Sequence, residues 1–329
     1  MVTIEKSFDT IPSIKIVFLT CFVLNLLAIS QISQASALSC DDDNAAPIGT
    51  LFEDMDGFFV GSNGCAYDPS LFKAENITAV EPTNGSTLEN TTPIFVVNGG
   101  FATLDELINR LQATADAKQR PVIGIYNAYL DLLGEFLKLF DLINPSAATF
   151  RDEAFEQIND GHRVTLHGIS QAGFIISRSL IQLKFIIWLY NPFSESRRNE
   201  LIGLVDVEVV GGLGVYFPDG PRYVHYVNER DWLPYLSGIM IPNAHPGEGA
   251  VIATFNYQNE DCSDDPGSLL WEDYPGSNGS FETGNHKFGL NVHSLCAYSV
   301  TGYPYDALRD FAPEVGYATV PLELGFQIE

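Results

Sequence analysis

Blocks of apolar residues alternate with longer amphipathic stretches between residues 93 and 255, and the two kinds of block predict different elements. Strand-like runs occupy Pro93–Asn98, Val122–Tyr126, Arg163–Leu166, Val205–Val210, Tyr223–Val227 and Ala250–Phe255. Helix-like spacing occupies Leu104–Leu111, Ala128–Ile143, Phe150–Asp160 and Phe174–Leu183. Apolar strands that alternate with helices indicate an α/β fold, a doubly wound, mostly parallel sheet with helices on both faces.

Turn residues set the limits of these elements. Asn144-Pro145 is expected to end the helix 128–143, and residues 191–200 are expected to form a loop. The helix 128–143 is apolar on nearly every side, which is typical of a buried core helix. The run Phe185–Tyr190 is either the buried end of the preceding helix or an exposed apolar rim.

The first residues predict a signal peptide. Lys6 and Lys15 precede or open the apolar run Ile16–Ile29, and Ala35-Ser36-Ala37 has the spacing of a cleavage site. The run is short for a membrane span, and no later apolar stretch is expected to be long enough for one. Cleavage after Ala37 makes residues 1–37 the signal peptide and predicts a secreted, periplasmic or extracellular protein. An uncleaved anchor is the alternative.

Cleavage would remove Cys21 and leave an even number of cysteines, which in an exported chain suggests two disulfides. The remaining four are Cys40, Cys65, Cys262 and Cys296. They allow three connectivities, of which Cys40–Cys65 and Cys262–Cys296 close the shortest loops.

The mature chain divides into a lead-in and a larger domain. Residues 38–92 are rich in Asp, Asn, Gly, Ser and Thr and predict an irregular, exposed lead-in, tied down if the disulfides form. N-x-S/T sequons occur at Asn76, Asn84, Asn90 and Asn278. Residues 93–329 form the expected main domain, which is the α/β domain, with a loop insertion around 257–285.

The formal net charge of −25 limits the range of partners. Nucleic acids and anionic membrane surfaces are bound by clustered Lys and Arg side chains, which this acidic composition argues against. High solubility is the plain interpretation of the charge.

The stretch His167-Gly168-Ile169-Ser170-Gln171-Ala172-Gly173 carries the first chemical signal. A serine between small residues, on a turn from a strand to a helix, is the signature of a nucleophile elbow. The turn is so tight that its flanking positions must be small, and Gly168, Ala172 and Gly173 meet that demand. An ordinary strand–turn–helix junction with a serine cap is the alternative, so further residues must decide.

Acyl transfer by a serine also needs a base, a carboxylate that orients the base, and N–H donors for the oxyanion. In doubly wound sheets these groups follow the strands in the order Ser, Asp/Glu, His. Ser170, Asp231 and His293 occur in that order, and His293 opens a last short helix pattern. Asn98-Gly99-Gly100-Phe101 follows the first strand, where an oxyanion turn belongs.

Three segments together resemble the α/β-hydrolase superfamily, in its lipase-like (class 3 lipase-like) branch. The elbow resembles the lipase elbow, Asn228–Tyr235 with Asp231 and Pro234 is similar to the segment that carries the lipase acid, and His293-Ser294-Leu295 with Tyr298 is similar to the segment that carries the base. The resemblance spans residues 93–300. It offers a lid or an acyl-chain wall as the alternative to a buried core position for the helix 128–143. It implies a Ser170–His293–Asp231 triad, with the N–H groups of Gln171 and of the Gly100/Phe101 turn as the oxyanion hole.

Rival residues stay open at this point. His286 lies seven residues before His293, His245 follows the acid segment, and Asp206 is the rival acid, although it lies within a strand pattern. His167, His162 and His225 are expected to be structural.

The sequence therefore predicts a secreted serine hydrolase of carboxylic esters, with a lipid or other acyl ester as substrate and no metal or organic cofactor. Transient contact with a lipid interface is left open. The alternatives are a non-catalytic binding or surface module on the same fold, or peptidase or thioesterase chemistry on the same triad.

Overall fold

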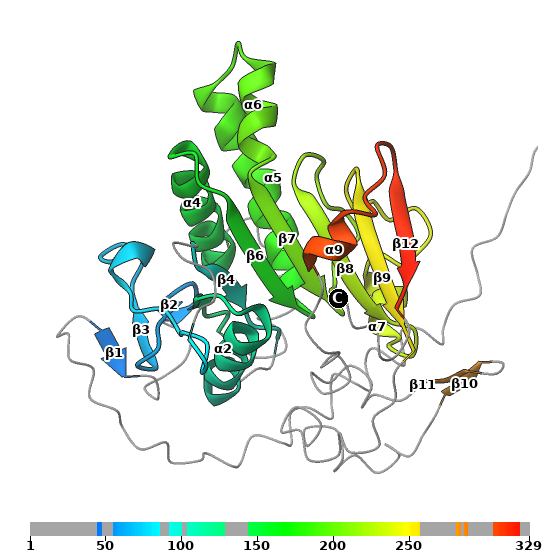
Figure 1. Cartoon of the computed structure of the whole chain (residues 1–329), viewed down its shortest axis with the longest axis horizontal. Coiled ribbons are helices and arrows are strands. Elements are labelled where there is room, and N and C mark those ends of the chain that lie inside the picture. The colour runs from blue at the N-terminus through cyan, green and yellow to red at the C-terminus, as the bar shows by residue number, and fades with distance from the viewer. Residues whose placement is uncertain are drawn as a thin grey trace, which may run out of the picture.

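The computed structural model describes residues 45–47, 55–85, 92–100, 104–128, 144–256, 281–283, 286–288 and 305–322. Within these residues the fold is built on one ten-stranded sheet of order β1-β3-β2-β5-β4-β6-β7-β8-β9-β12 (Figure 1). Neighbouring strands from β5 to β12 run parallel. They are β5 (Val122–Ile125), β4 (Ile94–Val97), β6 (Val164–Ile169), β7 (Val205–Val210), β8 (Arg222–Asn228), β9 (Ala250–Phe255) and β12 (Tyr317–Pro321).

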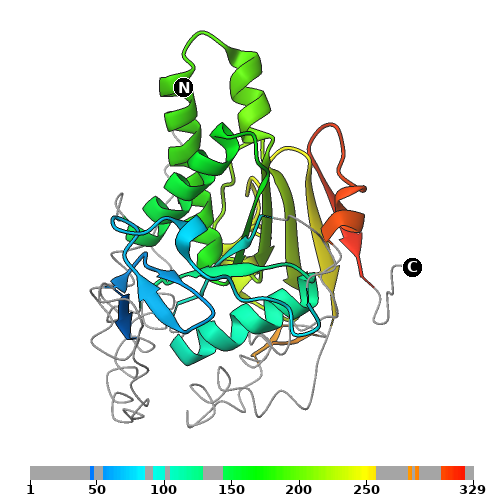
Figure 2. The same cartoon turned by 60° about the vertical axis from the view of Figure 1, so that its left-hand side comes forward.

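Helices cover both faces of the sheet, which confirms the predicted α/β class (Figure 2). One face packs against α4 (Pro145–Asn159) and α5 (Ala172–Tyr190), and α6 (Glu195–Ile202) lies against α5. The other face packs against α2 (Leu104–Lys118) near β4 and β5, and against α9 (Tyr305–Arg309) near β8 and β9. The short helix α7 (Leu233–Ser237) follows β8.

The segment 38–92 is more ordered than its composition predicted. Within it, β1 (Ala45–Pro47), β3 (Cys65–Tyr67) and β2 (Phe59–Val60) add an antiparallel edge to the sheet, and a 3-10 turn covers Ala74–Asn76. Strands of two or three residues are too short for a periodic pattern, so composition alone suggested a loop. Cys65 is buried. The other cysteines lie outside the described residues, and the disulfide pairings stay predictions.

Two expected limits of elements were wrong. The helix expected over Phe150–Asp160 begins earlier, as α4 at Pro145, because the Asn144 side chain caps it by accepting a hydrogen bond from the Ala147 N–H and proline suits its first turn. The expected end of the helix 128–143 lies outside the described residues. The expected loop 191–200 contains the start of α6, whose N-terminus is capped by Ser194. In the expected loop insertion, β10 (Phe281–Thr283) pairs with β11 (His286–Phe288).

The helix after the elbow is longer than its pattern predicted. It continues through Phe185–Tyr190, where Ile187 is buried but Phe185, Trp188, Leu189 and Tyr190 are exposed, so this run is mainly an exposed apolar rim. Contrary to expectation, α5 is long and apolar enough to cross a bilayer by length and composition, but half of its apolar window is buried in the protein. Residues 129–143, the core or lid helix of the prediction, lie outside the described residues.

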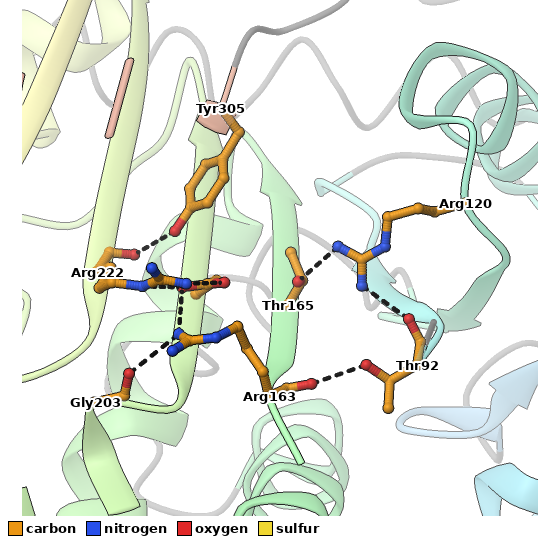
Figure 3. Close-up of polar contacts among 8 residues, drawn as sticks. Thr92, Arg120, Arg163, Thr165, Gly203, Arg222 and Tyr305 are labelled. Carbon is orange, nitrogen blue, oxygen red and sulfur yellow. Dashed lines mark hydrogen bonds and ion pairs between the residues drawn. The ribbon is translucent and has the colours of Figure 1, made fainter. Parts of the chain in front are cut away.

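Polar contacts tie the amino ends of the central strands together (Figure 3). Asp206 in β7 pairs with the guanidinium of Arg222 in β8 and with Arg163, while the Tyr305 hydroxyl donates to the Arg222 carbonyl. Arg120 links the Thr165 hydroxyl to the Thr92 carbonyl in the same region.

A buried charge cluster lies further along the same face of the sheet. Lys118, at the end of α2, pairs with Glu208 in β7, and His167 in β6 lies 3.6 Å from the same carboxylate. Burial acts to raise the pKa of Glu208, but Lys118 and His167 outweigh it and hold that pKa at about 2. The cluster therefore keeps its carboxylate charged inside the protein and fastens α2 to the sheet.

Candidate functional site

Ser170 lies on a strained turn between β6 and α5. Its φ is +57°, in the left-handed region that non-glycine residues seldom adopt. The turn brings its flanks together: a Cβ at Gly168 would lie 2.9 Å from the Cβ of Ala172 and 2.6 Å from Cδ1 of Ile176. A Cβ at Gly173 would lie 2.5 Å from the Leu213 carbonyl oxygen. These contacts give the physical reason for small residues on both sides of the serine.

Backbone hydrogen bonds hold this turn against β7. The Ser170 N–H donates to the Val210 carbonyl at 2.9 Å. The Ser170 carbonyl accepts from the N–H groups of Gly173, at 3.0 Å, and Leu213, at 2.9 Å. A left-handed serine costs of order 1–3 kcal/mol, so the surrounding bonds must over-determine it. Such strain at the carboxyl end of a central parallel strand is typical of a functional position.

The turn after β4 packs directly on the elbow. A Cβ at Gly99 would lie 3.2 Å from the Cβ of Ser170 and 3.7 Å from its Oγ. A Cβ at Gly100 would lie 2.6 Å from Oε1 of Gln171. The two turns therefore approach each other closely at both glycines, and the β4 turn lies where N–H donors for an oxyanion on Ser170 are needed.

Three buried amide side chains join the ends of β4, β5 and β6. Asn98 Oδ1 accepts from the Asn127 N–H at 2.8 Å, and Asn98 Nδ2 donates to the carbonyls of Gly99 at 3.0 Å and Asn127 at 2.8 Å. Asn127 Nδ2 then donates to Gln171 Oε1 at 3.0 Å. The exposed fractions of Asn98, Asn127 and Gln171 are 0%, 1% and 8%, so these bonds are shielded from water.

Asp231 lies in the turn after β8, at the same edge of the sheet as Ser170. It is fully buried; its Oδ1 accepts from the Leu233 N–H at 3.0 Å, and its own N–H donates to the Asn228 carbonyl at 2.9 Å. The loop after β7 links the Ser170 turn to α7, the helix that follows the Asp231 turn. Its Leu213 N–H donates to the Ser170 carbonyl, and its Gly214 N–H donates to the Ser237 carbonyl on α7 at 2.8 Å.

Of the remaining predicted site residues, some are described by the structure and others are not. Gly100 and Gln171 lie together beside Ser170, whereas His293 and Phe101 lie outside the described residues. The rival His286 is in β11, where the structure describes the backbone.

The other rivals lie away from the elbow. Asp206 pairs in register with Thr165, five residues before Ser170, which places it about 16 Å down the strand. His245 precedes β9 at the amino edge of the sheet, with its Nε2 2.7 Å from Oδ1 of Asp219. His225 is buried in β8 and its Nε2 lies 2.9 Å from the Pro246 carbonyl. Burial lowers the pKa of His225 to about 4, so this ring is neutral at physiological pH.

Sequence analysis missed Asn127 and the side chain of Gln171. The available signal was positional: Asn98 and Asn127 each follow a buried strand, and polar residues at the carboxyl ends of adjacent parallel strands lie at one edge of the sheet. Among the described residues no group of three or more His, Cys, Asp and Glu side chains could hold a metal ion. No protein-family model, curated protein or solved structure matches this chain significantly.

Proposed function

We propose that this chain is an exported serine hydrolase of carboxylic esters, of the lipase-like α/β-hydrolase kind. The observation that carries the proposal is Ser170 in a left-handed turn at the carboxyl end of β6, with the Gly99-Gly100 turn of β4 packed against it. These two strands are neighbours on either side of the point where the strand order reverses, the place where open α/β sheets bind ligands.

In the proposed reaction Ser170 attacks the ester carbonyl carbon while His293 takes the hydroxyl proton. The oxyanion accepts hydrogen bonds from the Gln171 N–H, at the N-terminus of α5, and from the N–H groups of the Gly100/Phe101 turn. His293 then returns the proton to the leaving alcohol, leaving an acyl-enzyme. Water, deprotonated by the same histidine, hydrolyses it to the acid and frees Ser170.

Asp231 is assigned to orient the His293 ring and stabilise its protonated form. Its burial and the hydrogen bond from the Leu233 N–H hold the carboxylate in one position, as that role requires. The proposed substrates are lipid or other acyl esters, and the mechanism uses neither a metal nor an organic cofactor.

Initial rates on p-nitrophenyl esters of increasing chain length test the proposal. Ser170→Ala and His293→Ala should each remove nearly all hydrolysis, and the double variant should be little worse than either, because the nucleophile and its base act as a unit. Asp231→Asn should be less damaging. The matched control is Ser237→Ala, which removes the hydroxyl of an exposed serine on α7 at the same edge of the sheet and should retain full activity.

The histidine controls separate two kinds of failure. His286→Ala and His245→Ala should keep most activity. If His286→Ala is inactive and His293→Ala is normal, the base is misassigned but the proposal of a serine hydrolase still holds. Full activity in Ser170→Ala would exclude the mechanism. A wild-type chain inert to every ester would favour peptidase or thioesterase chemistry, or a non-catalytic binding module.

A further inference from the structure

We propose that Asn127 is a positioning residue that sets the spacing between the two halves of the oxyanion hole. Its catalytic consequence rests on the proposed function, whereas its structural basis rests on hydrogen bonds between described residues. One half, the Gly99-Gly100 turn, follows β4, and the other half, the Ser170-Gln171 turn, follows β6. Asn127 follows β5 and touches both.

The backbone of Asn127 is fixed first. Asn98, the residue that opens the β4 turn, accepts from the Asn127 N–H and donates to the Asn127 carbonyl, each at 2.8 Å. The same Asn98 amide donates to the Gly99 carbonyl at 3.0 Å. One side chain therefore fastens the Gly99 peptide to the end of β5.

The side chain of Asn127 then reaches across β4. The strand order β5-β4-β6 places β4 between Asn127 and the elbow, so the bond from Asn127 Nδ2 to Gln171 Oε1 passes beside the β4 turn. Gly100 is the point of passage, because a Cβ there would lie 2.6 Å from the same Oε1. The Gln171 amide is thus held against the turn that its own backbone N–H is proposed to assist.

Burial makes this connection selective for one geometry. With Asn98 and Asn127 at 0% and 1% exposure, a broken hydrogen bond cannot be replaced readily by one to bulk water, and an unsatisfied buried amide is strongly unfavourable. The three amides consequently favour the arrangement in which all their bonds are made. This arrangement fixes the Gly100 peptide relative to the Gln171 peptide.

The expected effect on catalysis follows from the sensitivity of oxyanion binding to position. Removing one donor outright typically lowers turnover by about 10²–10³, and a displacement of about 1 Å costs about 10². Asn127→Ala leaves both donors present but loosens their spacing. We expect kcat to fall about tenfold to a hundredfold, with KM changed less than about twofold, since the oxyanion exists only in the transition state.

The experiment compares wild type, Asn127→Ala, Gln171→Met and the double variant. Asn144→Ala is the matched control, because it removes another buried asparagine, the cap of α4, which has no hydrogen bond to the described residues of either turn of the site. Hydrogen-exchange mass spectrometry follows residues 94–103 and 167–176, and p-nitrophenyl butyrate gives kcat and KM.

We expect faster exchange in both segments of Asn127→Ala but not of Asn144→Ala. The loss of activity in Asn127→Ala should be confined to kcat, and the double variant should be no worse than either single variant. Unchanged exchange, a kcat loss equal to that of Asn144→Ala, or losses that multiply in the double variant would overturn the role of Asn127. If wild type has no esterase activity but Asn127→Ala still exchanges faster than wild type in both segments, the link between the turns stands and the proposed function is excluded.

Discussion

Replacing Gly100 by alanine should disturb the site far more than one methyl group suggests. The new Cβ would lie 2.6 Å from Oε1 of Gln171, a distance at which one of the two atoms must shift, and 3.2 Å from its Cδ, inside an ordinary carbon–carbon contact of about 3.5 Å. The Gln171 amide must move and give up its bond to Asn127, or the β4 turn must shift. Either response costs about 1–3 kcal/mol, the range for a buried amide that loses a partner or for an overpacked site.

A second substitution repairs the conflict. Gln171→Ala removes Oε1 and Cδ, and the remaining Cβ lies 3.7 Å from the methyl group added at Gly100, an ordinary contact. Urea unfolding of the two single variants and the double variant should therefore give a favourable coupling of about 1 kcal/mol or more between these positions. Ester hydrolysis should fall in Gly100→Ala. A neutral Gly100→Ala, or strict additivity of the two substitutions, would refute the packing of Gln171 over the turn.

Three further outcomes can be measured by urea unfolding. Burial puts the pKa of His225 at about 4, below its ordinary 6.5. As pH falls from about 6.5 to 4, the unfolded chain therefore gains a proton at this residue that the folded chain does not. Between pH 7 and pH 5 the free energy of unfolding of wild type should fall by about 2 kcal/mol more than that of His225→Gln. Lys118→Met should cost about 3–5 kcal/mol, because it leaves the buried Glu208 carboxylate without its cation. Lys73→Ala, which breaks an exposed ion pair, should leave the free energy of unfolding almost unchanged. Ser170→Gly should be about 1 kcal/mol more stable than Ser170→Ala, because glycine accepts a φ of +57° without strain; equal stabilities would mean that the turn is unstrained.

Elements buried on both faces of the sheet were the easiest to predict. Val205–Val210 and Ala250–Phe255 have the same limits in the sequence pattern and in β7 and β9, because a continuous apolar run flanked by turn residues leaves little choice. Elements on the surface were harder. The polar helix α6 has little apolar periodicity, and Asn144-Pro145 can stop one helix or begin another, so its role depended on a capping contact that the pattern does not show.

In the candidate site, too, some features could be predicted from the sequence and others could not. The small residues about Ser170 were predictable because the elbow is local: Gly168 and Ala172 meet across a single turn. The amide chain was not, because Asn98 and Asn127 are 29 residues apart and Asn127 and Gln171 are 44 apart. Side chains separated by that length of chain meet only through the strand order, which the periodicity of one sequence does not determine.

The most direct test of the central claim is to map the site of reaction of a fluorophosphonate by peptide mass spectrometry. The probe's phosphorus accepts the oxygen of an activated serine and releases fluoride, so it marks the nucleophile itself. One adduct is expected per chain, on Ser170, retained in Ser237→Ala and lost in both Ser170→Ala and His293→Ala. An adduct on another serine, or a wild-type chain that stays unlabelled under conditions that label a known serine esterase, would contradict the assignment of Ser170 as the nucleophile.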